Sequence, residues 1–155
     1  MDEGLKDAAA SGGALQALPT GAIVELTDDP ERVDLDALWD FLSTGAYWGK
    51  WRDEEAVRRQ VAGAWRVVSA HLDGRMVGFA RAVADGVGLA YLADVYVLPE
   101  VRGRGVGHAL VALMIDEGPG REFRWMLHTL DAHSLYAAFG FAEPPETYME
   151  RTGGK

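Results

Sequence analysis

The sequence predicts an α/β (α+β) fold in a single domain. Segments with strand periodicity alternate with segments whose apolar residues recur at helical spacing. Their order is strand, two helices, three strands, helix, strand, helix, strand, and a glycine-rich helix start between two strands indicates a βαβ crossover. A length of 155 residues is enough to bury one substantial core, and no linker divides the chain.

The first third of the chain predicts a tail, a strand and two helices. Residues 1–20 are rich in Ala, Gly and Ser and are expected to be a poorly ordered tail, so the domain is expected over 21–155. An alternating strand follows at 22–26. Asp29-Pro30 predicts the start of a first helix, and Gly45 is expected to end it. A second helix is expected over about 53–62. The first helix has apolar residues at i, i+3, i+4 and i+7: Leu35, Leu38, Trp39 and Leu42.

The remaining elements are a three-stranded meander and then alternating helices and strands. Asp73-Gly74 predicts a two-residue hairpin turn of the primed type, since both residues tolerate positive φ. The strands of the meander are expected at 65–72, 76–84 and 90–98. After them we expect a helix at 104–117, a strand at 122–129, a helix at 132–138 and a final strand opened by Gly140-Phe141.

The composition excludes several classes of function. A formal net charge of −9 argues against nucleic-acid binding, because phosphates would be repelled. The absence of cysteine excludes disulfides, a thiol nucleophile and a cysteine-ligated zinc site. No apolar run is long enough to cross a bilayer and the first residues have no signal-peptide pattern, so a cytoplasmic protein without membrane contact is expected.

The stretch from Val95 to His108 carries the strongest functional signal. It runs from a β-branched strand through a turn into a helix, with the spacing Arg102-x-x-Gly105-x-Gly107. A helix N-terminus has unpaired N–H groups and the positive end of the helix dipole, so it can bind pyrophosphate. Glycine lets phosphates approach the backbone, and Arg102 would add a charge-assisted contact. The alternative is a turn that binds nothing.

This spacing resembles the acyl-CoA-binding motif of the GNAT superfamily of N-acetyltransferases. A second segment, Leu135-Tyr136-x-x-x-Gly140-Phe141, resembles the end of the family's next strand-plus-helix unit. The two motifs stand in the family's order, separated by one helix and one strand. The resemblance extends from residue 22 to about 152 and implies a single domain with a mixed central sheet of about six to seven strands and four helices.

The resemblance also implies acetyl-CoA as co-substrate and no metal. In the family, the strand before the glycine turn is splayed from its parallel neighbour, so its backbone can pair with the pantetheine arm. By position this role falls on Val95, Tyr96 and Val97, whose side chains can at the same time be core. The pyrophosphate would lie against the turn and the helix start: Arg102, Gly103, Arg104, Gly105, Val106, Gly107 and His108.

The resemblance assigns proton donation to the leaving thiolate to Tyr136, with packing on the sheet as the alternative role. Two residues compete as the general base. His128 stands where many relatives carry a Glu, and histidines titrate near neutral pH. Asp94 stands mid-strand among apolar residues, on the same face as Tyr96, where a carboxylate is costly unless it is used or paired. A structural role is open for both, and Asp131 is expected to cap the short helix near His133.

The acceptor is expected over the first two helices, where Tyr47, Trp48 and Trp51 crowd the connecting loop. Exposed rings could hold an apolar or cationic amine, whereas buried rings would be core. The sequence thus predicts an acetyl-CoA-dependent N-acetyltransferase that acts by direct attack of a primary amine, on a small molecule or a protein. A non-catalytic acyl-CoA-binding or protein-interaction module is the alternative. Another acyl donor, such as succinyl-CoA, and a homodimer are left open.

Overall fold

The structure, a computed structural model, describes residues 12–47 and 51–153. These residues form a six-stranded sheet whose strands follow one another in chain order. β1 to β5 pair antiparallel, and β5 pairs with β6 in parallel, so the sheet is mixed, as predicted. The strands are β1 (Gly13–Ala17), β2 (Ile23–Thr27), β3 (Arg66–Leu72), β4 (Arg75–Ala84), β5 (Leu89–Val97) and β6 (Arg124–Met126).

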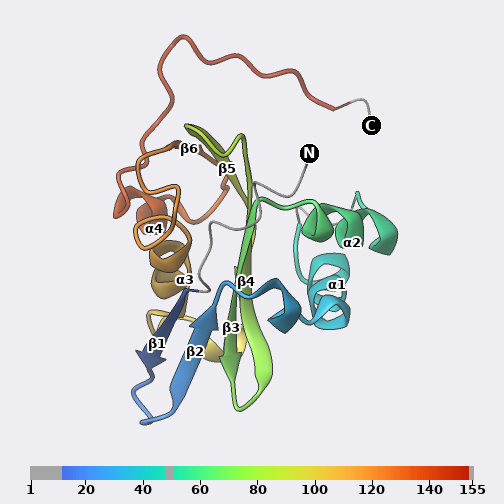
Figure 1. The fold of residues 1–155 in the computed structure, drawn as a ribbon, viewed down its shortest axis with the longest axis vertical. Helices are drawn as coiled ribbons and strands as arrows, with labels where there is room; N and C mark the ends of the chain where they lie inside the picture. Colours follow the sequence, from blue (N-terminus) through green and yellow to red (C-terminus); the bar gives the residue numbers. More distant parts are fainter. Residues whose placement is uncertain (1–11, 48–50, 154–155) are drawn as a thin grey trace, which may run out of the picture.

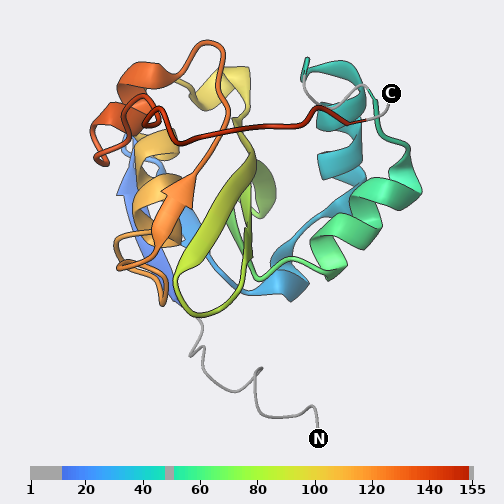
Figure 2. The same cartoon turned by 90° about the horizontal axis from the view of Figure 1, so that it is seen from above.

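Helices cover both faces of the sheet. In the described ranges the α-helices are α1 (Leu35–Thr44), α2 (Glu54–Ala62), α3 (Val106–Met114) and α4 (His133–Ala137). α1 and α2 lie on one side of the strands, and α3 and α4 lie on the other (Figures 1 and 2). Each side has its own core, built around Leu38 and Phe79 under α1 and around Leu110 and Met114 on α3. No helix of this part of the chain has the length and apolar character needed to span a membrane.

Acidic caps begin the two helices of the first face. Asp34 accepts a hydrogen bond from the Ala37 N–H at 3.0 Å, and Asp53 caps α2 in the same way. The expected helix start at Asp29-Pro30 is therefore wrong by five residues, because Asp29 caps only a single 3₁₀ turn, Pro30–Arg32. Gly45 ends α1, as predicted.

The predicted primed hairpin turn is confirmed. Asp73 and Gly74 connect β3 to β4 with φ values of 51° and 78°, the left-handed conformations that this turn type requires at both central positions.

Two expectations about the ends of the chain are corrected. Residues 13–17, expected within a poorly ordered tail, form β1, because their backbone pairs with β2 regardless of their small side chains. The final strand expected from Gly140-Phe141 is absent from the described residues. The segment after α4 instead crosses one end of the molecule, from the α3/α4 side toward α1 and α2 (Figure 2).

Candidate active site

β5 has a long open edge. Its parallel pairing with β6 covers only Leu89 to Tyr91, which lie opposite Arg124 to Met126. β6 ends there, whereas β5 continues to Val97, so the described residues provide no strand partner for Leu92–Val97 on this side. The expectation that this strand parts from its parallel neighbour is confirmed. Its free N–H and C=O groups can accept an extended ligand as an added strand.

A β-bulge interrupts the other edge of β5. Arg81 pairs with Ala93 and Phe79 pairs with Tyr96, so two residues of β5 oppose one residue of β4. The bulge contains Asp94, whose φ of 53° is unusual for a residue other than glycine. The extra residue bends the strand at the middle of its open edge.

The segment after β5 leads into an uncapped helix start. We call residues 102–107 the glycine turn. Gly103 and Gly105 have φ values of 72° and 85°, which side chains disfavour. Gly105 is the N-cap of α3, and no side chain caps this helix, so its first N–H groups are open. A Cβ atom on Gly105 would come within 2.9 Å of Gln16 Nε2 on β1. The glycine turn thus presents backbone atoms, rather than side chains of its own, at the end of the open edge of β5.

Several predicted coenzyme residues can contribute only their backbone. Arg102 donates from Nε to the Val97 carbonyl oxygen at 2.7 Å, which ties the turn to β5 and uses one donor of the side chain. Val106 is buried in the core. Tyr96 is also buried, on the α1 side, where its ring stacks on Phe41 with centroids 3.9 Å apart.

The other predicted coenzyme residues line the outer surface of this region. Val95 packs partly buried against the α3 core, as does Val97. Arg104 is exposed and free of ion pairs to described residues. The exposed ring of His108 lies 4.6 Å from that of Phe139, centroid to centroid.

A pocket of ≈ 480 Å³ lies between the open edge of β5 and the loop after β6. We call it the β5 pocket. The Tyr47 hydroxyl accepts a hydrogen bond from the Leu130 N–H at 3.1 Å and so joins the α1–α2 loop to the loop after β6. Tyr47 and Trp51 line the pocket and are 51% and 58% exposed, so their rings are not core residues. Trp48, the other predicted acceptor residue, lies outside the described residues.

Asp94 forms a buried cluster with two arginines beside this pocket. Arg52 donates to both carboxylate oxygens at 2.9 and 2.7 Å, and Arg81 Nε donates at 2.6 Å. Burial alone would raise the pKa of Asp94, but the hydrogen bonds and charges of Arg52 and Arg81 outweigh it and hold the pKa below its ordinary value. Such a carboxylate is a poor proton acceptor. The geometry therefore removes Asp94 from the candidates for the general base and favours its structural role.

His128 lies in a chain of hydrogen bonds. Its Nδ1 is 2.6 Å from the Tyr91 hydroxyl, and its Nε2 is 2.5 Å from the Glu150 carboxylate, to which Tyr148 also donates at 2.7 Å. The hydrogen bonds from Tyr148 and then His128 hold the pKa of Glu150 below its ordinary value. Burial, followed by the charge of Glu150, raises the pKa of Tyr91. A neutral Tyr91 can therefore donate to Nδ1 while Nε2–H donates to an ionised Glu150.

Sequence reasoning missed the partners of His128. Tyr91 could have been found from the strand register, because it pairs with Met126, two residues before His128. Glu150 and Tyr148 carry no local signal, since they stand in the irregular segment that crosses one end of the molecule.

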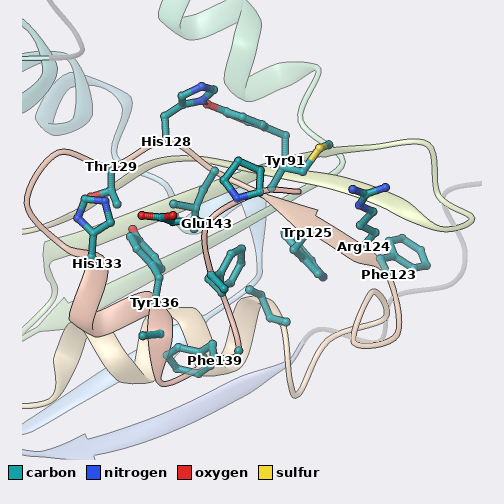
Figure 3. A pocket seen from close by; sticks show the side chains of 18 of the residues that line it. Tyr91, Phe123, Arg124, Trp125, His128, Thr129, His133, Tyr136, Phe139 and Glu143 are labelled. Atoms are coloured by element: carbon teal, nitrogen blue, oxygen red, sulfur yellow. The ribbon is translucent and has the colours of Figure 1, made fainter. Parts of the chain in front are cut away.

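Tyr136 lies on α4 between two pockets. It lines the β5 pocket and a larger pocket of ≈ 1010 Å³ along β6 and α4, which Figure 3 shows together with Tyr91 and His128. Burial raises its pKa to about 12, so the phenol is neutral at ordinary pH. Its ring packs edge-on against Phe141, but its hydroxyl has no hydrogen-bond partner among the described residues. The hydroxyl is thus available to a ligand.

The start of α4 differs from the prediction. Its N-cap is Ala132, which has no capping side chain, and the Ala132 N–H donates to Thr129 Oγ1 at 3.0 Å. The expectation that Asp131 caps this helix is therefore wrong, and Asp131 lines the β5 pocket instead. Among the residues that the structure describes, no three His, Asp or Glu side chains converge as metal ligands would.

These features agree with comparisons to known proteins. The family model described as Acetyltransferase (GNAT) family matches residues 24–141, so the chain belongs to the GNAT acetyltransferase family. A solved structure from Xanthomonas campestris pv. campestris, described as belonging to the GNAT family, is 37% identical to this chain. It superposes with a TM-score of 0.77 and covers 84% of this chain and 93% of its own.

Two further relatives extend the comparison. A Clostridium acetobutylicum structure, described as a predicted acetyltransferase with acetyl-CoA, has a TM-score of 0.59 at 13% identity and covers 92% of this chain and 96% of its own. It shows a shared fold. The Gibberella zeae protein named "Putative acetyltransferase FG08082" is 33% identical over 104 residues, which are 65% of this chain. The matched region spans 57% of that curated relative's length.

Proposed function

We propose that the chain is an acetyl-CoA-dependent N-acetyltransferase that transfers the acetyl group to a primary amine by direct attack. One continuous feature carries the proposal: the open edge of β5 from Leu92 to Val97 leads into the uncapped start of α3. An acyl-pantetheine arm could pair with the edge while its pyrophosphate binds the helix start. The fold shared with the Clostridium acetobutylicum structure described with acetyl-CoA supports this donor.

The residues at the glycine turn fit a pyrophosphate. Gly103 and Gly105 adopt left-handed conformations and carry no side chain of their own that would cover their backbone N–H groups. The exposed Arg104 supplies a cation at the same turn. Acetyl-CoA would bring an acetyl thioester, which is already activated toward a nitrogen nucleophile. The chain then has to orient an amine and move two protons.

The first proton must leave the amine, because only about 0.04% of an alkylamine with a lysine-like pKa is neutral at pH 7. The Tyr91–His128–Glu150 chain supports His128 as the general base, acting through Tyr91. Tyr91 lines the β5 pocket, and its hydroxyl could accept the amine proton as its own proton passes to His128 Nδ1. The carboxylate of Glu150 would stabilise the resulting imidazolium.

The second proton would go to the departing thiolate. Tyr136 suits this role because its neutral hydroxyl stands at the junction of the two pockets without a partner in the described chain. Its raised pKa keeps the phenol protonated at ordinary pH, so that a neutral hydroxyl donor stands ready for the departing sulfur.

The test is turnover. The purified full chain is incubated with acetyl-CoA and a panel of primary amines, and free CoA thiol is measured over time. The proposal expects thiol release that depends on particular amines. Tight acetyl-CoA binding with no amine-stimulated release would instead favour the non-catalytic acyl-CoA-binding module.

A further inference from the structure

The floor of the β5 pocket carries more positive charge than negative charge. Arg52 and Arg81 share a single carboxylate, that of Asp94, and all three side chains are at least nine-tenths buried. The cluster also has too few acceptors for its donors, since Arg52 Nε is sealed from solvent without a partner in the described residues. A buried charge that is not compensated is costly, so a site with one surplus guanidinium favours an anion beside it.

The surplus donors that a ligand in the pocket can reach belong to Arg81. Both terminal nitrogens of Arg52 are in use, because they donate to Asp94 and, at 2.6 Å, to Gln60 Oε1. Arg81 uses only Nε, and its two terminal nitrogens have no acceptor among the described residues. These nitrogens are not sealed from solvent, and Arg81 lines the β5 pocket. The free side of the guanidinium is therefore reachable from the pocket.

The other residues and the volume of the pocket indicate which kind of anion would bind beside Arg81. Asp131 and His128 also line it, on the loop after β6, where they suit an amine rather than an anion. The volume of ≈ 480 Å³ is that of a small-molecule site. One surplus positive charge matches a monoanion, and two parallel N–H donors of a guanidinium match the two oxygens of a carboxylate.

We infer that the acceptor is a small amino-carboxylate, whose carboxylate binds the terminal nitrogens of Arg81 while its amine faces Tyr91 and His128. This inference rests on the proposed N-acetyltransferase function and narrows the substrate class. Amines without a nearby carboxylate, including the amino terminus of a protein, leave Arg81 unpaired and are poor acceptors.

The experiment compares amines that differ only in the carboxylate. Leucine, phenylalanine and 4-aminobutyrate are each paired with the corresponding amide, and kcat/KM is measured by thiol release. For at least one pair the acid is expected to exceed its amide by at least about tenfold. In the α-amino pairs intrinsic reactivity favours the amide, because its amine is less basic and a larger fraction of it is the neutral nucleophile. A preference for the acid therefore has to overcome this difference. Equal rates, or a preference for the amides in every pair, would overturn the inference.

A variant of Arg81 tests whether this residue causes the preference for the acid over the amide. Arg81→Lys keeps a cation for Asp94 but loses the planar pair of donors, so it should raise KM for the preferred acid about tenfold and leave the amide and acetyl-CoA almost unchanged. Arg75→Lys, on the same strand but in an exposed ion pair with Glu100, is the matched control and should keep the preference. An equal loss for acid and amide would mean that Arg81 only supports the fold.

A direct binding measurement distinguishes failure of the proposed acetyltransferase function from failure of the carboxylate site. If no amine is acetylated, calorimetry compares N-acetyl-leucine with N-acetyl-leucinamide on the wild type and on Arg81→Lys. Selective binding of the acid by the wild type alone supports the carboxylate site without turnover. Equal binding, or none, rejects it.

Discussion

The glycine turn and the β5 pocket lie along the same edge of β5 but are built in different ways. The turn offers mainly backbone: two left-handed glycines and the N–H groups of an uncapped helix. The pocket is built from side chains that come from distant parts of the chain, such as Arg52 with Asp94 and His128 with Glu150. A backbone site tolerates changes in most side chains but not the addition of one. A side-chain site is lost when any one of its partners is removed.

The largest expected effect comes from adding a side chain to the turn. In Gly105→Glu, a bulky carboxylate at φ 85° meets Gln16 and repels pyrophosphate. Acetyl-CoA affinity should fall by more than about 10³-fold, equivalent to about 4 kcal/mol. Gly21→Glu is the matched control, because Gly21 has φ 86° and open space around it, far from this turn in the chain. Calorimetry checks both variants, and unchanged affinity in Gly105→Glu would remove the turn from the coenzyme site.

The next effect concerns the stability of the side-chain region. Asp94→Asn leaves two buried guanidinium groups without a carboxylate and should lower the free energy of unfolding by about 3 kcal/mol. Asp36→Asn, in the exposed pair with Arg58, should cost at most about 1 kcal/mol. Denaturant unfolding measures both. Similar small losses in the two variants would show that the cluster is not a stabilising centre.

The same cluster predicts a dependence of stability on pH. The pKa of Asp94 is lower in the folded state than in the unfolded chain, so unfolding takes up a proton at acid pH. Its contribution is fully present above the unfolded pKa and is lost as pH falls through the folded pKa. The stability difference between wild type and Asp94→Asn should therefore shrink as the solution is made acidic. A difference that grows toward low pH would contradict the assignment.

The Tyr136 hydroxyl, at the junction of the β5 pocket and the larger pocket, should affect rate and not binding. Tyr136→Phe removes only the hydroxyl, the proposed proton donor, and keeps the ring that packs on Phe141. Turnover should fall on the order of 10²-fold with acetyl-CoA affinity unchanged. Steady-state kinetics and calorimetry separate the two quantities. Equal falls in rate and affinity would mean that Tyr136 acts by packing.

The smallest effect is expected at the mouth of the β5 pocket. Tyr47→Ala should raise the acceptor KM by several-fold, consistent with about 1 kcal/mol for an exposed aromatic contact with a cation. Tyr47→Phe keeps the ring and removes the hydroxyl that accepts the hydrogen bond from Leu130, so its effect should be smaller. A lower melting temperature without any change in KM would show that Tyr47 serves the fold alone.

The difference between the two regions also explains what could be predicted from the sequence. The glycine turn is encoded by contiguous residues, so the spacing Arg102-x-x-Gly105-x-Gly107 was enough to place it, together with most of the strands and helices. β1 was missed because edge pairing depends on the backbone, whereas composition suggested a tail.

The side-chain region could be predicted only in part. Asp94 was recognised as a costly buried carboxylate, but its partners Arg52 and Arg81 lie 42 and 13 residues away, and no periodicity indicates such pairs. The same holds for Glu150 beside His128, because an irregular segment brings them together. Long-range contacts of this kind depend on the completed fold.

Transfer of a labelled acetyl group tests the central claim most directly. The wild-type chain is incubated with acetyl-CoA that carries ¹³C in both acetyl carbons and with the most active amine of the panel, and free thiol and labelled product are measured in the same samples. The account predicts one ¹³C-acetyl amide, with the label on the acceptor nitrogen, for each CoA thiol released. Thiol release without labelled amide, or coenzyme binding without any release, would contradict it.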